Sequence, residues 1–185
     1  MKSVSHIFGG EAKVKVMRLF VFNPGVTFTA SETAKRTKER PNKARKELHI
    51  LAKAGLIKKR TRGFALNPSY VYLPAVENFL IDATPITAKE IIKKVSCVGN
   101  IKLILTSGVF LHDRNSRVDI LVVGDHLKQS KLLSIMSSIE AELGKELRYA
   151  AFETVDFKYR LSIYDKLIRD ILDSRHEKIL NKIGI

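Results

Sequence analysis

This 185-residue sequence has only one cysteine, no tryptophan and no long apolar run. Its single cysteine, Cys97, cannot form an internal disulfide, argues against a cysteine-based zinc site and fits a reducing intracellular setting. No run approaches the roughly 18 apolar residues that a membrane-spanning helix needs, and residues 1–10 contain no apolar signal core. We therefore expect a soluble, cytoplasmic protein without membrane contact.

Acidic residues are scarce in the first 70 residues, which contain 16 Lys or Arg and 4 Asp or Glu. Residues 71–185 contain 17 and 15, so the net charge of +14 belongs mainly to the amino-terminal part. Localised positive charge is typical of a surface that neutralises phosphates, because binding a polyanion releases its condensed counterions. A membrane surface would also attract this charge, but the segment lacks the wide apolar face and aromatic side chains of an interfacial helix.

Familiar catalytic motifs are missing as well. The sequence contains no Walker loop, no glycine-rich dinucleotide turn, no Ser/His/Asp grouping and no histidine spacing suited to a metal. We therefore expect neither a metal nor a cofactor.

The most informative stretch is a basic helix followed at once by a basic hairpin. Pro41 suits the first turn of a helix, and Gly55 suits the residue just past its end. Between them Ala44, Leu48 and Leu51 recur at helical spacing and predict a narrow buried stripe. The opposite side contains hydrogen-bond donors and no acidic residue, namely Asn42, Lys43, Arg45, Lys46, His49 and Lys53.

Two short strands are predicted directly after this helix, over residues 56–60 and 64–67. Residues 61–63 form the tight connection, in which Gly63 can adopt a positive φ. This hairpin contributes four further cations, Lys58, Lys59, Arg60 and Arg62.

The residues before the basic helix complete a recognisable order of elements. An apolar helix is predicted over residues 11–22, and Thr29 with Glu32 forms a capping box that opens a short helix ending near Thr37. Helix, capped helix, basic helix and hairpin is the order of a winged helix-turn-helix, which reads the major groove with its last helix. We assign this domain to residues 1–70.

We therefore expect a transcriptional regulator that binds double-stranded DNA. Asn42 and Arg45 or Lys46 are the candidates for base readout, because Asn and Arg make bidentate contacts to adenine and guanine, whereas wing cations position the backbone. The full predicted set is Arg40, Asn42, Lys43, Arg45, Lys46, His49, Lys58, Lys59, Arg60 and Arg62.

Two other interpretations of the basic segment remain open. The helix could be an ordinary solvated surface helix, or the winged helix could bind a protein partner instead of DNA. A homodimer is compatible with the DNA-binding interpretation, since such regulators pair to read two half-sites, but no heptad or other self-association signal is present.

The remainder of the chain predicts linker helices and a small α/β domain, which makes the whole chain α+β. The linker, residues 71–98, contains helices over residues 71–81 and 87–98. The second domain, residues 99–185, alternates strands and helices. Its predicted strands are 101–106, 117–123, 147–152 and 178–180, and its predicted helices are 129–143, 153–160 and 163–172.

Within this domain, a strand followed by Ser107-Gly108, a short insert and the segment 116–123 resembles the minimal nucleotidyltransferase fold. In that family a Gly-Ser pair cradles the triphosphate, while an Asp-x-Asp and a later carboxylate hold magnesium. The resemblance covers roughly residues 98–182. Its position behind a winged helix is similar to a class of prokaryotic transcriptional regulators with nucleotidyltransferase-like carboxyl-terminal domains.

The sequence departs from that motif at three places. Asp119 matches the second Asp, but Arg117 occupies the position of the first, residues 148–152 contain no carboxylate, and the Gly-Ser pair is reversed. Magnesium bound through phosphates needs anchoring carboxylates, so we expect a catalytically inactive domain. Glu153 could supply a displaced ligand, and an active nucleotidyltransferase targeted to nucleic acid is the alternative.

Asp119 has two interpretations. It is a metal ligand, or it is a structural partner for Arg117, Arg114 or a backbone N–H. A remaining pocket, formed by Ser107, Gly108, Arg117 and Asp119, could still hold a nucleotide or another small effector. Ser107, Gly108 and Arg117 would then contact its phosphate oxygens.

Overall fold

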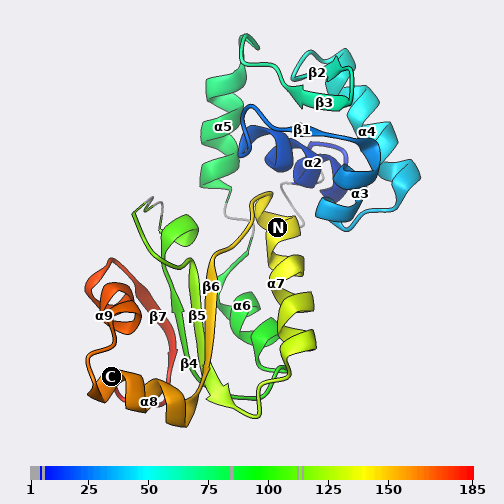
Figure 1. Cartoon of the computed structure of the whole chain (residues 1–185). Helices are drawn as coiled ribbons and strands as arrows, with labels where there is room; N and C mark the ends of the chain where they lie inside the picture. The colour runs from blue at the N-terminus through cyan, green and yellow to red at the C-terminus, as the bar shows by residue number, and fades with distance from the viewer. Residues whose placement is uncertain (1–4, 6, 84–85, 112, 114) are drawn as a thin grey trace. The chain divides into compact units, whose positions relative to one another are not determined.

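The computed structural model describes residues 5, 7–83, 86–111, 113 and 115–185, and shows a mixed α+β protein (Figure 1). This confirms the predicted class. The chain forms two compact units: the first comprises residues 1–87 with 137–146, and the second comprises residues 88–136 with 147–185.

Four helices of the first unit follow the predicted order. They are α2 (Glu11–Val21), α3 (Ala30–Thr37), α4 (Pro41–Lys53) and α5 (Leu73–Asp82). The capping box at α3 is confirmed, since the Glu32 N–H donates to Thr29 Oγ1 at 3.1 Å and the Thr29 N–H donates to Glu32 Oε2 at 2.7 Å. Helix α4 begins at Pro41 as predicted, and Gly55 follows its end with φ +85°.

A three-stranded antiparallel sheet completes this unit. Its strands are β1 (Thr27–Phe28), β2 (Ile57–Arg60) and β3 (Gly63–Leu66), in the order β1-β3-β2. The predicted hairpin is confirmed, with Ile57 paired to Leu66 and Arg60 paired to Gly63. Strand β1 was not predicted, because two residues are too few to show an alternating pattern.

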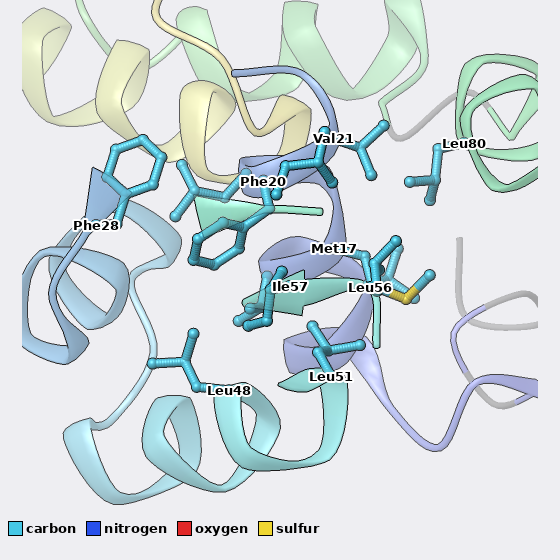
Figure 2. Close-up of a cluster of buried hydrophobic side chains, with 13 residues drawn as sticks. Met17, Phe20, Val21, Phe28, Leu48, Leu51, Leu56, Ile57 and Leu80 are labelled. Carbon is cyan, nitrogen blue, oxygen red and sulfur yellow. The ribbon is translucent and has the colours of Figure 1, made fainter. Parts of the chain in front are cut away.

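The core of the first unit fixes the orientation of α4. Figure 2 shows Phe20 of α2, Leu48 of α4 and Ile57 of β2 converging in one cluster, and all three are fully buried. Phe20 meets Phe28 edge-on, with ring centroids 5.6 Å apart, a favourable aromatic geometry. Since the predicted stripe of α4 faces this core, its polar side must face outward.

The second unit is built on a four-stranded mixed sheet. Its strands are β4 (Asn100–Thr106), β5 (Ile120–Asp125), β6 (Tyr149–Glu153) and β7 (Glu177–Asn181), in the order β6-β5-β4-β7. Strand β4 is antiparallel to both of its neighbours, and β5 is parallel to β6.

Its helices are α6 (Ala88–Val95), the short 3₁₀ helix η1 (Gly108–Phe110), α7 (Gln129–Leu143), α8 (Thr154–Ser162) and α9 (Lys166–Asp173). The last residues of α7, from 137 onward, belong to the first unit.

The prediction that β5 begins at Arg117 is wrong. The strand begins three residues later, at Ile120. Before it, the side chains of Ser116 and Asp119 hydrogen-bond to Ser107 and to the Val109 N–H.

Candidate nucleic-acid interface

The outer face of α4 and the β2–β3 hairpin present the predicted cations to solvent. All ten predicted DNA-binding residues are exposed, while Ala44, Leu48 and Leu51 on the inner side of α4 are 0–4% exposed. The helical period therefore separates the two faces as the sequence indicates. The exposed set is Arg40, Asn42, Lys43, Arg45, Lys46, His49, Lys58, Lys59, Arg60 and Arg62.

Most of these cations have no acidic partner. Within the described part of the chain, only Lys43 among the ten forms an ion pair, with Glu39 at 3.1 Å between Nζ and Oε2. An exposed pair at this spacing contributes only a few tenths of a kcal/mol. The remaining positive side chains can therefore take up an external anion without first breaking an internal ion pair.

Three acidic side chains near α3 and α4 have partners within the first unit. Glu47 is buried on the inner side of α4, and its carboxylate lies 3.8 Å from Lys13 Nζ. Glu39 also lies 3.7 Å from Lys15 Nζ. The hydrogen bonds that Glu32 accepts from Thr29, mainly from its backbone, lower the pKa of Glu32 below its ordinary value. These three carboxylates are thus paired with cations or with the capping box.

Sequence reasoning missed this arrangement of carboxylates. The signals were present, since Glu47 falls between Ala44 and Leu48 on the buried stripe, and Glu39 precedes Lys43 by four residues. Two further exposed residues extend the outer face of α4: Lys53, and Ile50, which is 37% exposed. Ile50 places one aliphatic group on an otherwise polar surface.

The hairpin supplies cations on both of its faces. Side chains alternate along a strand, so Lys58 and Arg60 share one face of β2 and Lys59 lies on the other. Arg62 belongs to the two-residue turn between Arg60 and Gly63. At Gly63, φ is +144° and a Cβ would overlap the carbonyl oxygen of Phe28. Glycine is therefore required for the hairpin to approach β1.

In the second unit, Asp119 is a structural partner of the backbone. The residue is 4% exposed. Its Oδ1 accepts from the Val109 N–H at 2.9 Å, and its Oδ2 accepts from the Arg148 N–H at 2.7 Å. The Arg148 guanidinium lies 3.5 Å from both oxygens. Gly108 packs so closely beneath it that a Cβ would overlap Oδ1. This carboxylate joins η1 to the start of β6.

The four residues of the predicted effector pocket are only partly brought together. Ser107 lies with Gly108 and Asp119, but its hydroxyl already donates to the Arg175 carbonyl and accepts from Ser116 at 2.9 Å. Arg117 is exposed and pairs with Asp170, with Nε 3.2 Å from Oδ2. Of the structural partners predicted for Asp119, a backbone N–H is confirmed. Arg117 is not its partner, because Arg148 is the arginine that lies beside Asp119. Arg114 lies outside the described residues.

Glu153, the alternative third carboxylate, is also engaged. It ends β6, and its two oxygens accept from the backbone N–H groups of His126 and Leu127, both at 3.0 Å. Among the residues that the structure describes, no group of three or more His, Cys, Asp or Glu side chains is arranged to hold a metal ion.

Comparisons with protein-family models, curated proteins and solved structures find no match. Over the described residues, no helix combines the length and apolar character needed to cross a membrane.

Proposed function

We propose that the protein is a transcriptional regulator that binds double-stranded DNA through a winged helix-turn-helix in its first unit. In this proposal α4 enters the major groove and the β2–β3 hairpin is the wing on the backbone. The observation that carries the proposal is the exposed set of cations on α4 and the hairpin, of which only Lys43 has an ion-pair partner among the described residues. Such a surface can release counterions from a duplex.

The proposed roles differ along the interface. Asn42 and Arg45 lie on the exposed side of the first two turns of α4, where side chains of a recognition helix reach base edges. Lys46 is the second candidate for readout. The wing residues Lys58, Arg60 and Arg62 bind phosphates, which adds affinity without sequence preference.

For the second unit we propose an inactive nucleotidyltransferase-like domain that senses a ligand or supports oligomerisation. The protein's own hydrogen bonds to Asp119 and Glu153 support this, since each oxygen of both carboxylates already accepts a backbone N–H. The test is incubation with labelled nucleoside triphosphates and magnesium. We expect no label transfer, and transfer abolished by Asp119→Ala would identify an active nucleotidyltransferase.

Selection of bound sequences from a random DNA pool tests the proposed function directly. We expect the wild-type protein to enrich a motif, and Arg45→Ala to relax selection at one position within it. The matched control is Lys58→Ala on the wing, which should weaken binding while retaining the same motif. Failure to bind any duplex at moderate salt would contradict the proposal and favour a protein partner.

A further inference from the structure

The first unit contains a cavity of about 470 Å³, lined by residues of α2, β1, α3 and the carboxyl-terminal end of α7. All of its described lining residues belong to this unit, because residues 137–146 pack with residues 1–87. The volume lies within the range of small-molecule sites in proteins, roughly 300–1,000 Å³. We call it the α3–α7 cavity, and its lining includes Leu19, Val26, Phe28, Lys35, Glu140 and Lys145.

Contacts within the first unit hold the α2 and α7 walls of this cavity together. The Asn23 side-chain amide donates to the carbonyl oxygens of Leu19 and Gly144, both at 2.7 Å. Gly144 has φ +75° and lies so close to Arg18 that a Cβ at this position would overlap the Arg18 backbone. The cavity is thus built by the fold itself, which lowers the cost of ordering its walls around a ligand.

The acidic side chains at the α3–α7 cavity already have partners. Glu146 forms an ion pair with Arg36, at 2.5 Å between Oε1 and Nη1. Glu32 accepts the Thr29 N–H in the capping box, and Glu140 also has a partner within the protein. These three carboxylates therefore do not require a cation from a ligand.

Two lysines at the cavity differ from these carboxylates, because neither forms an ion pair within the described part of the chain. Lys35 lies on α3 and Lys145 follows the end of α7, and both are exposed. The uncompensated charge at the cavity is therefore positive. Lysine ammonium groups bind anions through charge-assisted hydrogen bonds, so this pair favours an anionic ligand.

Apolar side chains supply another part of the lining. Leu19 and Phe28 belong to the core and are nearly fully buried, whereas Val26 is 43% exposed. A ligand with an apolar body would remove the exposed Val26 surface from water, which an inorganic anion cannot do. The lining therefore matches a molecule that combines a negative charge with an apolar body.

We propose that the α3–α7 cavity binds a small monocarboxylate with an apolar body. Its carboxylate is held by Lys35 and Lys145, and its apolar body lies against Val26 and Phe28. This inference goes beyond the proposed DNA binding and does not rest on it. Its test therefore uses the full chain without DNA.

The test is a titration with phenylacetate, which joins one carboxylate to an aromatic ring. Backbone ¹H–¹⁵N spectra should show saturable shifts at Val26 and Lys35, with a dissociation constant at or below about 1 mM. Acetate and inorganic phosphate keep the negative charge without the apolar body, and phenethylamine keeps the ring with a positive charge. All three should bind at least about tenfold more weakly.

The two lysines are tested together, and Lys35→Gln with Lys145→Gln should weaken phenylacetate binding at least about tenfold. The matched control is Lys128→Gln with Lys131→Gln, which removes the same charge from exposed positions of the second unit. It should leave binding unchanged. All four side chains are exposed, so both variants should fold, and circular dichroism checks this.

Three results would overturn the inference. The first is a wild type that shows no shifts at the cavity up to about 10 mM phenylacetate, a concentration that would nearly saturate a millimolar site. The second is equal binding of phenylacetate and any of the three matched probes. The third is an equal loss of binding in the two double variants.

Discussion

At the residue scale, Asp119 shows how a residue shared with a catalytic motif can serve the fold instead. Its carboxylate accepts two backbone N–H groups from segments far apart in sequence, at Val109 and at Arg148. A carboxylate held in this way is already saturated with donors. It would need to release the η1 loop or β6 before it could bind a cation.

We predict that Asp119→Ala destabilises the second unit by about 3 kcal/mol, because it leaves two amide donors without their acceptor. Chemical denaturation measures this loss. The control is Asp125→Ala at the end of β5, whose partly exposed carboxylate lies 3.9 Å from Lys102 Nζ. It should cost less than about 1 kcal/mol. Equal losses for the two variants would refute a structural role for Asp119.

Glu32 provides a prediction for pH. Hydrogen bonds from Thr29 hold the pKa of Glu32 below its ordinary value near 4.5 in the folded state. Its contribution to stability is therefore complete above that ordinary value, and it is lost as the pH falls through the lowered folded-state pKa. The difference in free energy of unfolding between wild type and Glu32→Gln should therefore vanish at a pH below the lowered folded-state pKa of Glu32.

Carboxyl ¹³C shifts recorded against pH would measure the Glu32 pKa directly. A titration midpoint at or above 4.5 would show that the capping box does not stabilise the charged form.

At the element scale, the hairpin depends on one backbone position. Gly63 pairs with Arg60 across the turn and lies against Phe28 of β1. A side chain at this position would push β3 away from β1. Because β3 also pairs with β2, the cations of β2 would move with it.

We predict that Gly63→Ala destabilises the first unit by more than about 2 kcal/mol, since it adds backbone overlap to the cost of a positive φ. Gly25→Ala is the control, because Gly25 also has a positive φ, +82°, but a Cβ added there would meet no atom within 4 Å. It should cost only about 1 kcal/mol. Denaturation midpoints compare the two, and a smaller loss at Gly63 would contradict the account.

The elements that sequence predicts well are those with a chemical signal at each boundary. Helix α3 has its capping box, and α4 has Pro41 and Gly55 at its ends. Strand β1 was missed because it exists only through its pairing with β3. The start of β5 was misplaced because the side chains of Asp119 and Ser116 hydrogen-bond to Val109 and Ser107, contacts that an apolar run does not predict.

In the candidate interface, the sequence predicted the exposed cations but not the positions of the acidic side chains. Helical periodicity was enough to place its cations on one face of α4. The burial of Glu47 against Lys13 required knowledge of how α2 packs. Arg18 is a second charged residue whose burial the sequence did not predict. Burial lowers the pKa of its guanidinium to about 10, although the nearby charge of Glu142 acts in the opposite direction. Periodicity alone gives no such pairing.

At the scale of the whole molecule, charge is divided unevenly. The first 70 residues contain 16 of the 33 Lys and Arg residues but only 4 of the 19 acidic ones. Glu32, Glu39 and Glu47 are each occupied by neighbours in the first unit. The positive field at α4 and the hairpin is therefore weakly opposed, which favours rapid, salt-dependent association with a polyanion.

The central claim is that these cations lie along a duplex, and the salt dependence of DNA affinity tests it most directly. We predict that log affinity falls linearly with log salt concentration, and that Arg60→Ala with Arg62→Ala reduces the slope by about 2. Lys128→Ala with Lys131→Ala removes the same charge from exposed positions in the second unit and should leave the slope unchanged. Affinity that does not depend on salt, or equal slope changes in the two variants, would contradict the account.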